Sequence, residues 1–212
     1  MTPKPRLVEI GSLEPPRMAH QYLVVLAGTQ PLVWRRILVP STYTFWDLHV
    51  AIQDAMGWKD CHLHEFEIVG PPGEPSLRIG LPNRELPEAR QPLPGWEVPI
   101  ENAFAAGGNV ARYHYDFGDD WVHAVMYEGH VIPKLGRKLP VCVAGAGACP
   151  PEDCGGPPGY ERFLKIIANP YHREYREMLD WVGGLFDPDK FDAKKVKFDD
   201  PRERWRRAFQ ER

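Results

Sequence analysis

Three histidines stand at spacings that can bring their ring nitrogens to one metal ion. His62 and His64 are separated by one residue at the start of a strand-like run, so an extended backbone points both rings to the same face. His123 lies in a second strand-like run and offers a third imidazole. Zinc in catalytic sites often takes two or three histidines and keeps one position open for water. The pattern predicts a zinc site at His62, His64 and His123. The alternative is that these are hydrogen-bonded structural histidines in a sheet.

Acidic residues in two glycine-containing segments extend this candidate site. Their carboxylates would serve as a further ligand, as partners that orient a histidine, or as a general base. The turn over residues 116–120 also suits a divalent cation, but it lacks the regular alternation of an EF-hand loop, and ordinary hairpin-turn chemistry explains the same aspartates. The acidic candidates are Asp116, Asp119, Glu152 and Asp153.

Cysteines offer an alternative metal site. Cys142, Cys149 and Cys154 follow one another at spacings C-x6-C-x4-C, and with Cys61 or a histidine as fourth ligand they would hold a structural zinc. These spacings match no standard zinc finger, and free cysteines are also readily buried as small apolar residues. Disulfides are not expected, because no export signal is recognisable.

The elements that must position these residues divide the chain into a strand-rich first half and a helical last third. Thr44 can cap a helix with apolar residues at helical spacing, and Gly57 can end it. With strands on either side, this order resembles the ββαβ start of a ubiquitin-like roll. The predicted strands are Tyr22–Leu26, Val33–Val39, Leu63–Val69, Leu77–Ile79, Arg112–Phe117 and Trp121–Ile132, and the later predicted helices are Tyr160–Ala168 and Glu174–Val182.

These elements predict a single α+β domain over residues 20–197, with an antiparallel or mixed sheet. A flexible Pro-rich lead-in is expected over residues 1–19, and residues 70–99 are interpreted as a Pro-rich surface excursion. The stretch from Pro140 to Pro158 contains too much Gly and Pro to predict regular structure there. A basic tail over residues 198–212 completes the chain.

Composition limits the classes of function. Of the 212 residues, 43% are hydrophobic and 26% are charged, which excludes a wholly disordered chain, and the formal net charge of −3 gives no overall basic surplus for a general nucleic-acid binder. Eight basic and four acidic residues lie between Lys194 and Arg212, so nucleic acid is expected only through this tail; a solvated terminal helix is the alternative. No apolar run reaches the length of a membrane span, so a cytoplasmic protein without a membrane partner is expected.

Several motifs, taken in order, resemble the plasmid pRiA4b ORF-3-like family over about residues 20–197. They are PLVWRR (31–36), HLHEF (62–66), YDFGDDWVH (115–123), CPPEDCGG (149–156) and WVGGLFDP (181–188). The resemblance implies association with plasmids and mobile elements, and no settled activity. Some members are labelled TnpR-like passenger proteins of insertion elements. A resolvase needs an activated serine among arginines and a helix-turn-helix motif, and neither is recognisable in this sequence.

Two functions follow from these observations. The favoured one is a non-catalytic accessory or interaction protein of a mobile element. Its cysteine loop, the stretch from Pro140 to Pro158, and its basic tail would serve an unidentified protein partner. The alternative is a metal-dependent hydrolase-like enzyme that uses His62, His64 and His123 with an acidic neighbour. The first is favoured because the sequence shows no complete set of catalytic groups.

Overall fold

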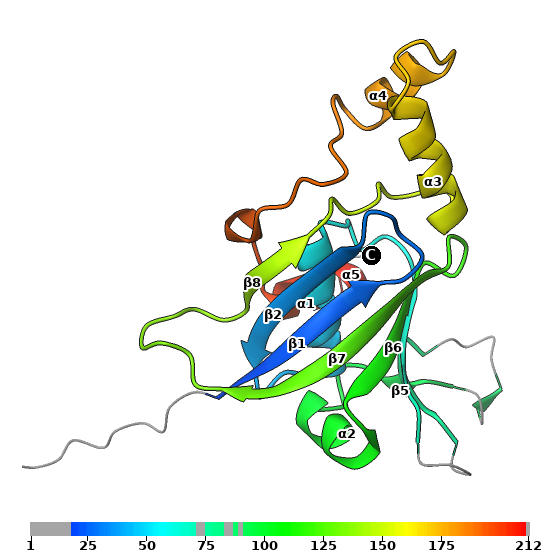
Figure 1. Ribbon diagram of the computed structural model, residues 1–212. Coiled ribbons are helices and arrows are strands. Elements are labelled where there is room, and N and C mark those ends of the chain that lie inside the picture. The colour runs from blue at the N-terminus through cyan, green and yellow to red at the C-terminus, as the bar shows by residue number, and fades with distance from the viewer. Residues whose placement is uncertain (1–17, 71–74, 83–86, 89–90, 211–212) are drawn as a thin grey trace, which may run out of the picture.

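An eight-stranded mixed sheet forms the centre of the computed structural model, which describes residues 18–70, 75–82, 87, 88 and 91–210. The strand order is β5-β4-β3-β6-β7-β1-β2-β8 (Figure 1). Neighbours are antiparallel except β4 and β5, which run parallel. The strands are β1 (Ala19–Leu26), β2 (Val33–Pro40), β3 (His64–Ile68), β4 (Leu77–Gly80), β5 (Leu93–Pro94), β6 (Val110–Tyr115), β7 (Trp121–Val131) and β8 (Val141–Ala146).

Helix α1 (Phe45–Met56) packs against one face of this sheet. The Thr44 side chain accepts a hydrogen bond from the Asp47 N–H while the Asp47 carboxylate accepts one from the Thr44 N–H, a reciprocal cap that begins the helix. Gly57 ends it with a left-handed backbone at φ 95°. Phe45, Leu48 and other apolar residues of α1 are buried in the common core. The predicted helix and its two ends are confirmed.

Two hairpins account for most of the sheet. β1 pairs with β2 as predicted from their apolar runs, and β6 pairs with β7 across the Asp116–Asp120 turn. β3 follows α1, so the predicted ββαβ start is present. The β6–β7 hairpin lies between β3 and β1, which widens the sheet beyond that start. The α+β prediction with a mixed sheet is confirmed.

The C-terminal third leaves the sheet and returns to it. Helices α3 (Gly156–Ile167) and α4 (Tyr175–Trp181) project beyond the end of the sheet. The chain then runs back beside β8 to the short 3-10 helix η2 (Ala193–Lys195) and to helix α5 (Pro201–Phe209), which packs on α1 (Figure 1). Much of the predicted basic tail is therefore a packed helix.

The structure corrects the prediction for residues 140–158. Val141–Ala146 form edge strand β8, and α3 begins four residues before its predicted start, because Pro157 and Pro158 fall in the first turn, where proline is tolerated. Gly145 is required for close packing: a Cβ there would come within 2.4 Å of the Phe191 ring and 2.8 Å of the Trp34 carbonyl oxygen. The glycine that argued against regular structure thus permits the strand to lie under Phe191.

Other differences are smaller. Helix α2 (Ile100–Gly107) and strand β5 were not predicted, whereas the short strand at Leu77–Ile79 is present as β4. Residues 1–17 of the predicted lead-in and residues 71–74, 83–86, 89 and 90 of the Pro-rich excursion lie outside the described residues. Within the described ranges, no helix has both the length and the apolar character needed to cross a bilayer.

Candidate functional site

Three of the sequence motifs meet at His62. The ring Nε2 atom lies 3.0 Å from Asp153 Oδ1, on the loop before α3, and 3.5 Å from Asp116 Oδ2, in the β6–β7 turn. The His62 side chain is 29% exposed, Asp153 is mostly exposed and Asp116 is almost wholly buried. Residues from HLHEF, YDFGDDWVH and CPPEDCGG therefore form one cluster, which we call the His62 cluster: His62, Asp116 and Asp153.

The β6–β7 turn fixes the Asp116 carboxylate. Asp116 has a positive φ of 54°, and its Oδ1 accepts hydrogen bonds from the backbone N–H groups of Gly118 at 3.0 Å and Asp119 at 3.3 Å. Because Oδ1 is occupied by the turn, Oδ2 is the oxygen that faces His62.

Asp119 ties the same turn to the loop before α3. Its Oδ2 accepts a hydrogen bond from the Gly155 N–H at 3.0 Å. A Cβ at Gly156 would stand 2.2 Å from the Asp119 carbonyl oxygen, so only glycine permits this approach. The predicted candidate Asp119 is thus a positioning residue that holds two loops of the cluster together.

Glu152 is held beside the His62 cluster by the protein itself. Its Oε1 accepts hydrogen bonds from the Lys59 N–H at 2.7 Å and from the Tyr115 hydroxyl at 3.1 Å, and that hydroxyl accepts one from the Cys61 N–H at 3.2 Å. Burial and the nearby Glu152 carboxylate raise the pKa of Tyr115, so its hydroxyl remains a donor. Glu152 therefore joins the loop after α1 to the loop before α3.

His64 lies in a different environment from His62. Its ring stacks on His49 with centroids 3.4 Å apart and an interplanar angle of 9°. His49 pairs through Nε2 with Asp60 at 2.8 Å and through Nδ1 with the Tyr113 hydroxyl at 2.8 Å. Burial, followed by the neighbouring His49, lowers the pKa of His64 well below its usual value, so the ring is neutral.

The stacked pair is poorly suited to a metal although His49, Asp60 and His64 offer ligand atoms within 4.8 Å of one another. The lone pairs of an imidazole lie in the ring plane. Two parallel rings 3.4 Å apart direct their lone pairs along separate planes, and no single ion lies in both. The described geometry thus favours a structural role for this pair.

His123 is enclosed in the sheet. It is fully buried, its Nδ1 lies 3.3 Å from the Tyr113 carbonyl oxygen, and burial lowers its pKa to about 3. The Tyr113 ring contacts both His64 and His123. Among the described residues, no group of possible metal ligands contains two of His62, His64 and His123. The three-histidine zinc site is therefore not formed.

The alternative cysteine site is not formed either in the part of the chain that the structure describes. No group of possible ligands contains two of the three predicted cysteines. The Cys142 thiol donates to the Ala144 carbonyl at 3.4 Å, burial raises the pKa of Cys149, and burial raises the pKa of Cys154 to about 12. These thiols are protonated at neutral pH and are poor nucleophiles.

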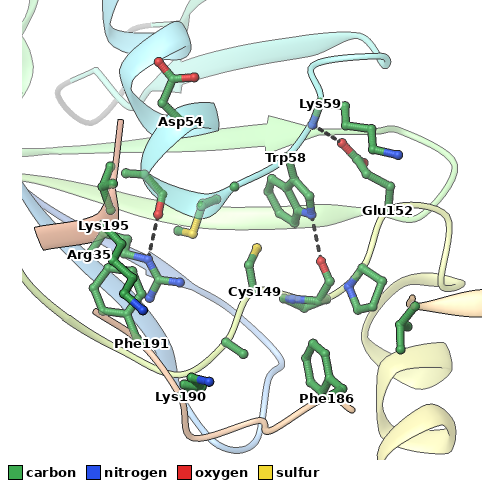
Figure 2. A pocket seen from close by; sticks show the side chains of 18 of the residues that line it. Arg35, Asp54, Trp58, Lys59, Cys149, Glu152, Phe186, Lys190, Phe191 and Lys195 are labelled. Carbon is green, nitrogen blue, oxygen red and sulfur yellow. Dashed lines mark hydrogen bonds between the residues drawn. The ribbon is translucent and has the colours of Figure 1, made fainter. Parts of the chain in front are cut away.

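A pocket of about 700 Å³ lies beside the His62 cluster. Its walls are the end of α1 with the following loop, the loop over residues 148–153, and the C-terminal segment that returns along β8. Figure 2 shows Lys59 and Glu152 at one end, Lys190, Lys195 and Phe191 at the other, and Trp58 and Cys149 between them. The Trp58 indole N–H donates to the Pro150 carbonyl at 2.9 Å, which joins two of the walls.

The unpaired charges of this pocket are positive. The acidic lining residues are engaged: Asp54 by Arg204, Glu152 as above, Asp153 by His62, and Asp192 by the Lys194 N–H. In the described ranges the ammonium groups of four exposed lysines have no carboxylate partner, and these are Lys59, Lys190, Lys195 and Lys197. Lys195 and Lys197 belong to the basic stretch recognisable in the sequence, whereas nothing in the sequence near Lys59 and Lys190 distinguishes these two.

Comparisons with known proteins agree with the motifs that meet here. The model of the plasmid pRiA4b ORF-3-like proteins matches residues 18–195. The chain belongs to the plasmid pRiA4b ORF-3-like family. It is 37% identical over 161 residues to the uncharacterized protein y4hQ of Sinorhizobium fredii, covering 76% of this chain and 78% of that protein. It is also 39% identical to a protein of unknown function, MM3350 from Methanosarcina mazei Go1, whose crystal structure superposes with a TM-score of 0.77 over 86% of this chain and 99% of that one.

The family match includes the candidate metal-binding loops and most of the pocket lining, but not the last helix. All residues of the His62 cluster lie within the matched residues, whereas α5 begins after the last of them. The relatives' names assign no activity, so the family and its relatives are proteins of unknown function.

Proposed function

We propose that this plasmid pRiA4b ORF-3-like protein is a non-catalytic accessory protein that binds an acidic segment of a protein partner in the lysine-lined pocket. The main support for this proposal is the make-up of the pocket. The cysteine loop and the lysine-rich C-terminal segment are far apart in sequence, yet they form two of its walls. The family name supports a setting on a plasmid or other mobile element. The expected partner remains a protein rather than nucleic acid.

Charge and shape both support an acidic peptide as the occupant. Four unpaired lysines surround the pocket, so carboxylates entering it gain charge-assisted contacts. The walls also present aromatic surface from Phe186 and half-exposed Trp181, while Trp58 lines the pocket but is largely buried. A segment that combines carboxylates with one aromatic side chain complements both features.

Helix α5 is poorly suited to bind nucleic acid. The basic residues of α5 are largely used within the chain: Arg204 pairs with Asp54 and Asp199, Arg207 pairs with Asp199, and Arg206 pairs with Glu203. A phosphate-binding tail needs cations that are free to meet phosphates. The hydrolase alternative in its three-histidine form loses its ligand set, because the three rings lie in separate environments.

The proposal is tested by fluorescence anisotropy with a fluorescein-labelled pentapeptide of four glutamates around one tryptophan. We expect saturable binding that weakens as salt is raised, because the contacts are between charges. The double variant Lys190→Glu, Lys195→Glu should bind at least tenfold more weakly.

The matched control is Lys134→Glu, Lys138→Glu, which reverses two exposed lysines on the segment between β7 and β8, outside the pocket. This control should bind like the unaltered protein. No binding by the unaltered protein, or an equal loss in both double variants, would contradict a specific role for the pocket.

A further inference from the structure

We propose that His62, Asp116 and Asp153 bind one divalent transition-metal cation. Their candidate ligand atoms all lie within 4.8 Å of one another. This ligand set retains His62 and replaces the other two predicted histidines with carboxylates from the β6–β7 turn and the loop before α3. It is independent of the partner proposed for the neighbouring pocket.

The distances within the His62 cluster fit ligands of a common ion. Two atoms that each lie about 2.1 Å from one metal are about 3.0 Å apart at a right angle and about 3.4 Å apart at the tetrahedral angle. His62 Nε2 lies 3.0 Å from Asp153 Oδ1 and 3.5 Å from Asp116 Oδ2. Both separations are close to those that a shared ion imposes.

His62 Nε2 also lacks a hydrogen-bond partner. This atom is shielded from solvent and makes no hydrogen bond within the described residues, although two carboxylate oxygens lie within 3.5 Å of it. A bound cation would give the nitrogen a partner. His114 Nε2 is likewise unpartnered beside Asp120, but no group of three possible ligands in the described residues contains His114, so the second carboxylate distinguishes the His62 cluster.

Asp116 contributes a carboxylate oxygen that the turn leaves available. The residue is only 7% exposed, and its Oδ1 accepts the two hydrogen bonds from the backbone of the turn. Oδ2 lies toward His62. It can therefore act as a metal ligand without breaking the turn.

The donor set indicates the class of ion. One imidazole and two carboxylates suit zinc and manganese, which accept mixed nitrogen and oxygen ligands. Because the Asp153 side chain is 69% exposed, water can complete the coordination from the solvent side. Glu152 and Cys61 lie near His62 as a further group, but Glu152 is already held by Lys59 and Tyr115.

The experiment measures binding of zinc chloride and of manganese chloride to untagged protein after chelation and dialysis, by isothermal titration calorimetry. We expect one equivalent of one of these metals to bind, and a rise in the thermal midpoint when it is added. His62→Ala and Asp153→Asn should each weaken the affinity at least tenfold and remove most of that rise, while circular dichroism shows that the metal-free variants remain folded.

The chain provides a matched control in His114 and Asp120. These form another histidine–aspartate pair, with 2.7 Å between Nε2 and Oδ1, and their side chains are 26% and 71% exposed. Asp120 and Asp153 also share a positive φ, 58° and 57°. His114→Ala and Asp120→Asn should keep full metal affinity, since this pair lacks a third ligand.

Three results would overturn the metal site. The unaltered protein could fail to bind either metal. His62→Ala and Asp153→Asn could keep the full affinity. The His114→Ala and Asp120→Asn controls could lose as much affinity as those variants. The pocket variant Lys190→Glu, Lys195→Glu should retain the metal, which separates this test from that of partner binding.

Discussion

Arg35 shows how a single buried charge is used for structure rather than for a ligand. Its guanidinium lines the pocket, yet it donates to the carbonyl oxygens of Ala55, Trp34, Ala146 and Gly147 at 2.8–2.9 Å and stacks over the Phe191 ring at 3.6 Å. It thereby joins α1, β2 and β8 to the returning C-terminal segment. An arginine inside the pocket is not by itself evidence of anion binding.

Replacing Arg35 with lysine should lower the free energy of unfolding by about 2–4 kcal/mol. The three guanidinium nitrogens of Arg35 donate to four carbonyl oxygens, and the single ammonium group of a lysine cannot reach all of them. The carbonyls that lose their donor remain buried without a hydrogen bond. Urea denaturation measures the loss as a lower midpoint. Arg36→Lys is the control, because the exposed Arg36–Glu128 pair should contribute less than about 1 kcal/mol. Equal losses in the two variants would contradict this role.

His123 should make the fold sensitive to acid. Its pKa of about 3 in the folded state lies below the usual 6.5, so the unfolded chain binds the proton first as the pH falls. The free energy of unfolding should therefore decrease from about pH 6 down to about pH 3, by up to about 1.4 kcal/mol per pH unit from this residue. His123→Asn should flatten that slope, as measured by denaturation at several pH values. An unchanged slope would show that His123 is not the residue responsible.

Among the helices, α5 acts as a brace: it packs on α1 and is linked to it by an ion pair, so it is not a free tail. Arg204 reaches from α5 to Asp54 on α1, at 2.6 Å, and to Asp199, at 2.8 Å. The Trp46 indole N–H donates to the Pro201 carbonyl, and Phe209 packs on Trp46. α5 begins after the last residue matched by the family model.

Removing the central ion pair of α5 should destabilise the whole protein. Arg204→Ala leaves the Asp54 side chain, only 7% exposed, without its guanidinium partner, and we expect a loss of about 2–3 kcal/mol in the free energy of unfolding. Arg206→Ala, which breaks only an exposed pair with Glu203, should cost less than about 0.5 kcal/mol. Similar thermal midpoints for the two variants would mean that α5 is not a brace.

The secondary-structure elements that could be predicted from the sequence are those with a clear local pattern. The hairpins and α1 carry alternating or helical apolar spacing with turn or cap residues at their ends, so sequence alone located them. β8 contains Gly145 in a stretch rich in Gly and Pro, and this glycine is needed because Phe191 and the Trp34 carbonyl leave no room for a side chain there. β8 pairs with β2, about one hundred residues earlier, and no local pattern records either contact.

The candidate site was predictable in part for the same reason. His62, Asp116 and Asp153 were selected by residue type and motif, but which histidines meet depends on strand pairing. His64 pairs with Tyr115 on β6, and His123 pairs with Tyr113, so strand β6 and the Tyr113 side chain separate the two rings. The pocket lysines come from two distant segments, and their meeting required the path of the C-terminal third.

In the whole molecule, the C-terminal segment that returns along β8 forms one wall of the pocket. Residues 181–197 close the pocket against α1 and the cysteine loop. This segment supplies three of the four unpaired lysines, while the remainder of the chain is net acidic. The central claim is that these lysines select an acidic partner segment.

The most direct measurement is an exchange of charge between protein and probe. The unaltered protein should bind the glutamate-rich pentapeptide and not its lysine-rich counterpart, and Lys190→Glu, Lys195→Glu should reverse that preference in the same anisotropy titration. Such a reversal places the selecting charges in the pocket. If both proteins bind the glutamate-rich peptide equally, the pocket lysines do not select the partner and the proposed function is wrong.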